Sequence, residues 1–297
     1  MNIFQNTQHE EHQYLNIIRE IINTGTWENG RNGKTKAIFG THMKFSLKDG
    51  CIPLLTTKKV AWKTCFKELT WFIKGSTSNK ELNEMGVKIW NGNASKEFLE
   101  SRGLSYEEND LGPVYGHQWR HFNAEYNDCN TDYSGKGVDQ LANVIKLLKN
   151  KEELSSRRLV ISAWNPCQID EMALPPCHVL MQFNVHQDKY LSCSLYQRSG
   201  DVGLGVPFNI ASYSFLTHII AKHCDLEPYS FVHFIGNAHI YDDHIEQLKE
   251  QCTREPKTFP RLYIKNKYDN IEDYSLDDIM WLTPYQHHDV IKMDMRV

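Results

Sequence analysis

The sequence predicts an α+β fold in one domain, residues 1–297. Of the 297 residues, 40% are hydrophobic and 24% are charged, which is the balance of a soluble globular protein with a sizeable core. Segments with helical and strand periods are interspersed without a regular β-α-β rhythm, and neither a G-x-G-x-x-G nor a P-loop pattern occurs. No linker and no internal repeat divides the chain, so a single domain is favoured over two.

The first elements follow from these two periods. Apolar residues recur at helical spacing from Tyr14 to Ile22 and Gly25 follows them, which predicts a capped helix. Residues 36–47 are rich in β-branched and aromatic side chains and end at a turn signal, so a strand is expected there. Residues 62–74 predict a second, buried helix that stops at Gly75.

Residues 91–137 are rich in Asn, Gly and Ser and predict a long surface insertion of short elements. Farther along, Leu191, Cys193 and Leu195 alternate with polar residues, which is the period of a strand with unlike faces. The elements expected after the insertion are a helix at 138–148, a strand at 159–163, a hairpin of 178–186 and 190–196, a helix at 211–224, a strand at 231–235 and a helix at 240–252.

Charge and composition exclude several classes of protein. The net charge of −4, without a basic block, disfavours a protein that binds nucleic-acid backbones. The apolar stretches are too short to span a membrane, and the first ten residues lack a secretory signal, so a cytoplasmic, reducing location is expected. The eight cysteines contain no C-x-x-C pair, which argues against structural zinc and predicts no metal site.

Cys177 is a candidate nucleophile. It follows Pro175 and Pro176, which cannot continue a helix, so the thiol sits at a rigid turn that can expose it. A thiolate is a strong nucleophile and is favoured by nearby cations. The alternative is one more buried thiol, which is the common state of an isolated cysteine.

Other polar residues suggest a phosphorylated heterocycle as the substrate. Arg157-Arg158 and Gln197-Arg198-Ser199 offer the donors that hold a phosphate, although arginine pairs are more often solvated surface charges. Asn209 carries both a donor and an acceptor, as a reader of a pyrimidine edge requires, but it also suits a helix N-cap.

Glu68, His239 and Tyr241 extend this set. Glu68 lies in an otherwise apolar helical segment and is either turned to solvent or desolvated, with a raised pKa suited to proton transfer. His239 and Tyr241 are two residues apart, so both side chains can reach one hydroxyl group of a ligand. Alternatively, either can be a structural residue whose polar atoms form hydrogen bonds within the protein. The residues alone therefore predict an enzyme that acts on a small phosphorylated heterocycle.

Two long runs, 157–178 and 191–213, closely resemble the thymidylate synthase family. The resemblance extends to 56–59, 67–75, 111–119, 236–241 and 291–297, so nearly the whole chain takes part. It implies a mixed β-sheet covered by helices and a homodimer formed through a sheet face, in which each site borrows residues from the partner.

The resemblance also implies a reaction, the reductive methylation of dUMP to dTMP. The substrate 5,10-methylenetetrahydrofolate would give both the carbon and the hydride, leaving dihydrofolate, without a metal. Cys177 would attack C6 of uracil, because C5 is otherwise too weak a nucleophile to take the methylene group.

Matched motif positions imply a role for each site residue. The residues implied in catalysis are Cys177, Glu68, Tyr115, Asn209, Arg198 and Asp201. Glu68 would run water-linked proton transfers, and Tyr115 would assist loss of the C5 proton. Those implied in dUMP binding are Arg31, Arg198, Ser199, Gln197 and Asp201 with Asn209 at the base, His239 and Tyr241 at the ribose, and Arg157 and Arg158 from the partner subunit. Those implied in folate binding are Lys58, Glu68, Trp90, Asp201 and the carboxy-terminal Val297.

Two segments depart from the family pattern. After Arg31, residues 32–36 read Asn-Gly-Lys-Thr-Lys instead of Thr-Gly-Thr-Gly-Thr, so this phosphate loop is expected to differ in order or charge. Asn237 stands where the family commonly has Asp, and Asp242-Asp243 stands where a neutral residue and Asn are usual, with a modest effect expected on the ribose contacts.

Three other functions compete. In a pyrimidine nucleotide hydroxymethylase, water traps the methylene group; Asn209 and Trp90 argue against it, since a cytosine site is expected to carry Asp and the indole excludes water. A catalytically inactive nucleotide-binding dimer would not be expected to keep Cys177, Glu68 and Tyr115 together. A Cys-His hydrolase fails because adjacent side chains of an extended segment point to opposite faces. Both a monofunctional enzyme and the synthase part of a fusion with dihydrofolate reductase fit the sequence.

Overall fold

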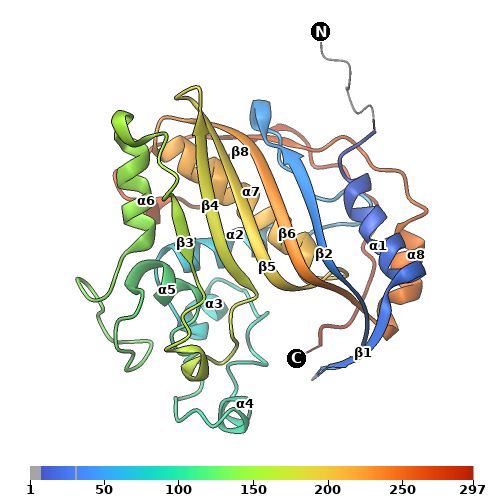
Figure 1. Cartoon of the computed structure of the whole chain (residues 1–297), viewed down its shortest axis with the longest axis horizontal. Helices are drawn as coiled ribbons and strands as arrows, with labels where there is room; N and C mark the ends of the chain where they lie inside the picture. The colour runs from blue at the N-terminus through green and yellow to red at the C-terminus, as the bar shows by residue number, and fades with distance from the viewer. Residues whose placement is uncertain (1–7, 31, 297) are drawn as a thin grey trace.

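The computed structural model of the chain describes residues 8–30 and 32–296, and its centre is a six-stranded mixed sheet (Figure 1). The strand order is β1-β2-β6-β5-β4-β3. The strands are β1 (Thr26–Gly30), β2 (Gly33–Ser46), β3 (Val160–Ser162), β4 (His178–His186), β5 (Tyr190–Asp201) and β6 (Glu227–Tyr241). The predicted α+β class with a mixed sheet is confirmed.

One pair of strands gives the sheet its mixed character. β5 and β6 run parallel and are joined by helix α7 (Gly205–His223), whereas the other neighbouring strands are antiparallel. Ser199 lies opposite Asn237, and Asp201 lies opposite His239. The carboxyl ends of β5 and β6 therefore bring their polar residues to one edge of the sheet.

The helices cover one face of the sheet. α7 packs on β5 and β6, and α2 packs on α7; Figure 1 shows both behind the strands. The helices of the described chain are α1 (His12–Thr24), α2 (Trp62–Ile73), α3 (Asn79–Glu84), α4 (Lys96–Ser101), α5 (Tyr115–His121), α6 (Gln140–Lys149), α7 and α8 (Ile245–Gln251). A small second sheet pairs β7 (Arg261–Ile264) with β8 (Ile279–Thr283).

The opposite face of the six-stranded sheet carries no helix of the described chain (Figure 1). One row across it runs through His42, Phe234, Tyr196 and Leu180, from β2 to β4. Phe234 is 43% exposed and Tyr196 is 42% exposed, although their neighbours along each strand are buried. This uncovered face is therefore apolar at its centre.

Most predicted elements are confirmed, but several boundaries are wrong. α7 begins at Gly205 rather than 211, because Pro207 lies in its first turn, where no backbone donor is needed. β6 spans 227–241 and not only 231–235, although it contains Gly236 and Asn237, which are unfavourable in strands. The helix expected at 240–252 therefore begins only at Ile245.

The expectation that 91–137 is a surface insertion is wrong for its central part. In α5, Tyr115 to Trp119 are all buried. A Cβ atom at Gly116 would lie 2.4 Å from the carbonyl oxygen of Ser76, so glycine allows α5 to approach the chain that follows α2. This polar segment is buried by tight backbone packing, which leaves no apolar periodicity in the sequence.

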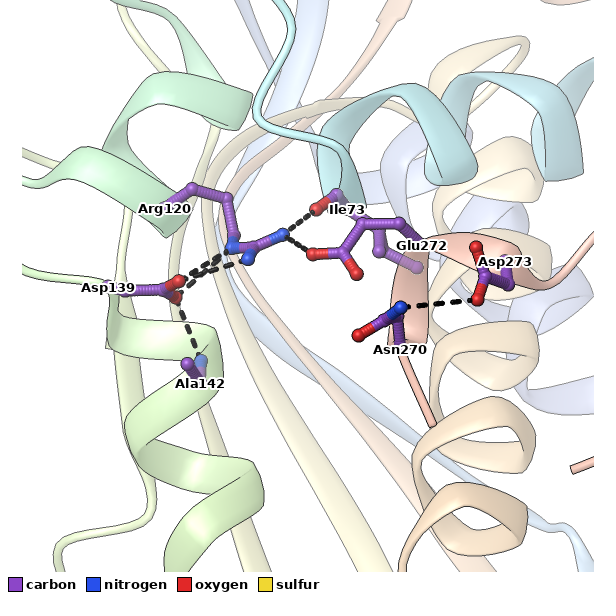
Figure 2. A network of polar contacts seen from close by, with 7 residues as sticks. All are labelled: Ile73, Arg120, Asp139, Ala142, Asn270, Glu272 and Asp273. Atoms are coloured by element: carbon purple, nitrogen blue, oxygen red, sulfur yellow. Dashed lines mark hydrogen bonds and ion pairs between the residues drawn. The ribbon is translucent and has the colours of Figure 1, made fainter. Parts of the chain in front are cut away.

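Arg120 joins α5 to three other parts of the chain (Figure 2). Its Nε donates to both carboxylate oxygens of Asp139, at 3.1 and 3.0 Å, and its Nη1 donates to the carbonyl of Ile73 at 2.6 Å and to Glu272. Asp139 also caps α6, accepting from the N–H of Ala142 at 2.8 Å. One guanidinium thus ties α5 to the end of α2, the start of α6 and the segment at 271–273.

Two further findings concern the described residues alone. Within 8–30 and 32–296, no group of three or more His, Cys, Asp or Glu side chains is arranged to hold a metal ion. In the same ranges, no helix combines the length and apolar composition that crossing a membrane requires.

Candidate active site

A cleft of about 730 Å³ opens at the edge of the sheet where β5 and β6 end. The loop at 174–177, the start of α5 and the turn between β1 and β2 complete its walls. The predicted site residues that line it are Trp90, Tyr115, Cys177, Arg198, Ser199, Asp201, His239 and Tyr241. The structure thus brings together residues that lie far apart in the sequence.

Cys177 lies on the loop that enters β4. Its backbone N–H donates to the hydroxyl of Tyr115 at 2.8 Å, and its carbonyl accepts from the N–H of Arg198 at 2.9 Å. The residue is only partly buried and lines the cleft, so the alternative of a core thiol is wrong. Burial raises the pKa of Tyr115, which therefore stays protonated at neutral pH.

Arg198 holds the turn in front of Cys177. Its Nε donates to the carbonyl of Pro176 at 2.9 Å, and its Nη2 donates to the carbonyl of Pro175 at 3.0 Å. The guanidinium also lies 5.5 Å from the ring centre of Trp164. Arg198 is therefore a built part of the cleft and not a solvated surface charge.

Glu68 lies on α2, behind the cleft wall. Its Oε1 accepts a hydrogen bond from the indole N–H of Trp90 at 2.7 Å. Burial raises the pKa of the carboxyl from 4.5 to about 7, against a smaller opposite effect of the Trp90 hydrogen bond. The prediction of a desolvated carboxyl is confirmed, and the alternative of a solvent-facing one is wrong.

Asp201 lies where β5 meets α7. Its Oδ1 accepts from the backbone N–H groups of Gly203 and Leu204 at 2.8 and 3.3 Å, which fixes the orientation of the carboxylate. The Lys58 ammonium donates to the carbonyl of Gly203, and burial lowers the pKa of Lys58 to about 8. Lys58 lines a neighbouring groove of about 380 Å³, between 58–61, 204–208 and 290–294, and not the main cleft.

The remaining predicted residues lie elsewhere. Asn209 is buried in the first half of α7, so the helix N-cap alternative is wrong. Gln197 is buried and donates to the carbonyl of Ser199 at 2.9 Å, and its Oε1 lies 2.8 Å from a ring nitrogen of His233. Arg157 and Arg158 are exposed just before β3 and do not line the cleft. Arg31 and Val297 lie outside the described residues.

His178, the neighbour of Cys177, packs between two aromatic rings and does not line the cleft. It is buried, with its ring 5.0 Å from that of Tyr115 and 5.4 Å from that of Tyr213. Burial lowers the pKa of His178 to about 4, so the ring stays neutral.

Three other residues that line the cleft were not predicted from the sequence. Glu28 comes from the edge strand β1, Arg102 from the end of α4 and Leu174 from the loop before Cys177. Glu28 and Arg102 lie in segments without an informative pattern, and Leu174 lies in the 157–178 run, where its side chain alone suggests no role. The tertiary arrangement brings all three to the cleft. Arg102 adds a second cation to the lining of the cleft that contains Arg198, and its Nε is buried without a hydrogen-bond partner.

Comparison with known proteins identifies relatives over nearly the whole chain. The family described as thymidylate synthase matches residues 12–297. Thymidylate synthase of Equine herpesvirus 2 is 53% identical over 291 residues, covering 97% of this chain and 99% of that protein. Human thymidylate synthase is 53% identical over 291 residues, covering 97% of this chain and 91% of that protein.

A longer relative shares the same region. The bifunctional dihydrofolate reductase-thymidylate synthase of Zea mays is 52% identical over 292 residues, which is 98% of this chain but 55% of that protein. The chain thus spans about half the length of this bifunctional relative. The motifs, the cleft and these matches agree, and the chain belongs to the thymidylate synthase family.

Proposed function

We propose that this chain catalyses the reductive methylation of dUMP to dTMP, with 5,10-methylenetetrahydrofolate as the donor of the carbon and the hydride. The observation that carries the proposal is that Cys177 and Arg198, joined through their backbones, line the same cleft, and that Glu68 behind its wall has a carboxyl of raised pKa. A nucleophile, a cation and a proton-transfer group are what addition to a phosphorylated pyrimidine requires.

Cys177 would begin the reaction at C6 of uracil. The thiolate forms the S–C6 bond, and the electron pair of the C5–C6 double bond makes C5 nucleophilic toward the methylene carbon. Loss of the C5 proton, assisted by Tyr115, would then break the bond between the methylene carbon and the folate nitrogen and leave an exocyclic methylene group on C5. Hydride from the folate would add to this carbon as the S–C6 bond breaks and the C5–C6 double bond re-forms, which releases the thiolate and dihydrofolate. The guanidinium of Arg198 donates to the carbonyls of Pro175 and Pro176 and so fixes the turn that presents the sulfur. The same guanidinium would bind the phosphate of dUMP.

The described residues fit a reduced folate beside the nucleotide. Trp90 supplies an aromatic wall that is held by Glu68, and the Asp201 carboxylate is oriented by two backbone donors to accept from a ring N–H. The Lys58 ammonium donates to the carbonyl of Gly203, whose N–H binds Asp201, so Lys58 would help to position the Asp201 carboxylate. Lys58 would also contact the glutamate tail of the folate.

The proposed enzyme is a homodimer formed through the uncovered sheet face. The row through Phe234 and Tyr196 is apolar and exposed, which a second copy would bury. Arg157 and Arg158 are exposed beside β3 and do not line the cleft of their own chain. This is what we expect of residues that contribute to the active site of a partner subunit. The proposed location is cytoplasmic, a reducing environment that would keep the eight cysteines, none of which forms a disulfide in the described residues, in the thiol state.

The test is the near-ultraviolet absorbance rise of dihydrofolate after the protein is mixed with methylenetetrahydrofolate and either dUMP or dCMP. We expect a rise with dUMP alone and its loss in Cys177→Ser. Cys167→Ser removes an exposed thiol outside the cleft and serves as the matched control. Exchange of the C5 proton without dihydrofolate would support the hydroxymethylase, and a folded protein with neither signal would support a nucleotide-binding protein.

A further inference from the structure

A chain of three polar side chains crosses one wall of the cleft. On β6, the Oδ1 of Asn237 lies 2.9 Å from the Nδ1 of His239. The Nδ2 of Asn237 donates to the Oε2 of Glu28, on edge strand β1, at 3.1 Å. All three residues line the cleft that holds Cys177. The imidazole is thus connected to a carboxylate through one amide.

The chemistry of these groups fixes the direction of each hydrogen bond. An ionised carboxylate only accepts, so Asn237 must turn its NH₂ group to Glu28 and its carbonyl oxygen to His239. The Nδ1 atom of His239 must then carry the hydrogen. In a neutral imidazole this leaves Nε2 as an acceptor.

The surroundings of His239 keep the ring neutral. Burial lowers its pKa below 6.5, and the nearby carboxylates of Asp201 and Glu28 oppose that effect only in part. The ring of Tyr241 lies edge-on to that of His239, with the ring centres 5.6 Å apart. An aspartate at 237 would add a third carboxylate and favour the imidazolium, which has no acceptor atom.

We propose that Glu28 and Asn237 are positioning residues that hold His239 as the Nδ1–H tautomer, which makes the cleft selective for a nucleotide sugar whose hydroxyl donates to Nε2. The inference rests on the proposed function, because dUMP supplies such a hydroxyl at its 3′ position. An aspartate at the same position could also accept from Nδ1, but its charge would favour the imidazolium as the pH falls, which the neutral amide of Asn237 does not.

The tautomer can be read directly by ¹⁵N NMR of the nucleotide-free protein labelled at its 14 histidines. Comparison with His239→Gln assigns the resonances. We expect a protonated Nδ1 and an unprotonated Nε2 from pH 6.5 to 8.5. A hydrogen on Nε2 in the wild-type protein would overturn the proposal, whether or not the protein forms dihydrofolate.

The consequence for binding is tested with dUMP and its 3′-fluoro analogue, in which fluorine cannot donate. Wild-type protein should bind dUMP about tenfold more tightly, the net worth of one hydrogen bond. Glu28→Lys offers only donors, so Asn237 must reverse its amide, the hydrogen moves to Nε2, and the preference should fall to roughly twofold. Asn29→Lys adds a lysine at the neighbouring exposed position outside the cleft and should keep both tautomer and preference.

Asn237→Asp supplies an independent measurement. The preference for dUMP over the fluoro analogue should fall as the pH is lowered from 8.5 to 6.5, because the imidazolium then forms. Both ligands carry the same phosphate, so protonation of the phosphate changes both dissociation constants by the same factor and leaves their ratio unchanged. A ratio that is independent of pH in this variant, or one that survives a demonstrated change of tautomer in Glu28→Lys, would refute the proposal.

Discussion

At Glu68, burial alone converts an ordinary carboxyl group into one that titrates near neutral pH. The side chain is 8% exposed, and its single hydrogen-bond donor among the described contacts is the indole N–H of Trp90. Since the pKa is about 7, the group can hold or release a proton where the proposed reaction needs both.

Glu68→Gln should therefore lower kcat much more than it weakens nucleotide binding. Glutamine keeps an acceptor for Trp90 but cannot transfer a proton, so a loss of roughly 10²- to 10⁴-fold in kcat is expected. Steady-state rates of dihydrofolate formation and the dissociation constant for dUMP measure the two effects separately. An unchanged kcat would remove Glu68 from the proton-transfer role.

The same carboxyl should make stability depend on pH. Its pKa is raised from 4.5 to about 7 in the folded state, so the folded state binds the proton more tightly than the unfolded chain. This contribution is fully present below about pH 4.5 and is lost as the pH rises through 7. The free energy of unfolding of Glu68→Gln relative to wild type should thus increase by on the order of 3 kcal/mol across this window. Urea unfolding at several pH values measures the difference, and a flat difference would show that Glu68 titrates normally.

The sequence pointed to eight residues that the structure places at one cleft, but it did not reveal their environments. Motif matching pointed to Cys177 and Arg198, yet the hydrogen bonds of Arg198 to Pro175 and Pro176 depend on how the loop closes on β5. Glu28 could not be predicted at all, because it reaches Asn237 from a strand about 200 positions away.

Among the elements, α5 depends most on contacts that periodicity cannot reveal. Its side chains are polar or aromatic, and it is held by the close approach at Gly116 and by the Arg120 network in Figure 2. The amphipathic helices and the alternating hairpin were predictable because their patterns match one buried face. The long strand β6 and the early start of α7 were not, since neighbours rather than local sequence stabilise their ends.

Arg120→Met should destabilise the fold by about 3 kcal/mol, because it leaves Asp139 and Glu272 without their cation and the carbonyl of Ile73 without its donor. Urea unfolding measures the change.

Lys249→Met is the matched control, since Lys249 pairs with Glu246 on an exposed helix surface. Its effect should be about 0.5 kcal/mol or less. Equal losses in the two variants would mean that the Arg120 network adds nothing beyond a surface ion pair.

For the whole molecule, the uncovered sheet face predicts the assembly state. Phe234→Asp places a charge at the centre of the apolar row and should convert the proposed dimer to monomers in sedimentation experiments. Tyr263→Asp changes a similarly exposed aromatic residue on β7 and should leave the dimer intact. A wild-type monomer, or a dimer that tolerates aspartate at 234, would exclude this interface.

Shared active sites would allow inactive subunits to restore each other. Cys177→Ser and the double variant Arg157→Glu, Arg158→Glu should each be inactive alone. After equal mixing and subunit exchange, half of the dimers are hybrids with one intact site, so about a quarter of wild-type activity should return. No recovery in proven hybrid dimers would place both arginines outside the partner's site.

The pairing of β2 with β6 sets an order of events during synthesis. Phe39 lies opposite Asn237, about 200 residues later, and the parallel partner of β6 also precedes it along the chain. At roughly 5–20 residues per second, a ribosome needs about 10 to 40 s to supply the strand that β2 and β5 both await. The edge of β2 stays unpaired for that interval, and the edge of β5 and the apolar α7 join it only near the end, once residues 190–223 have been made. Surfaces of this kind are what chaperones bind. The strand at the centre of the finished sheet is thus among the last to arrive, and its release from the ribosome is the step that lets the rest of the sheet close.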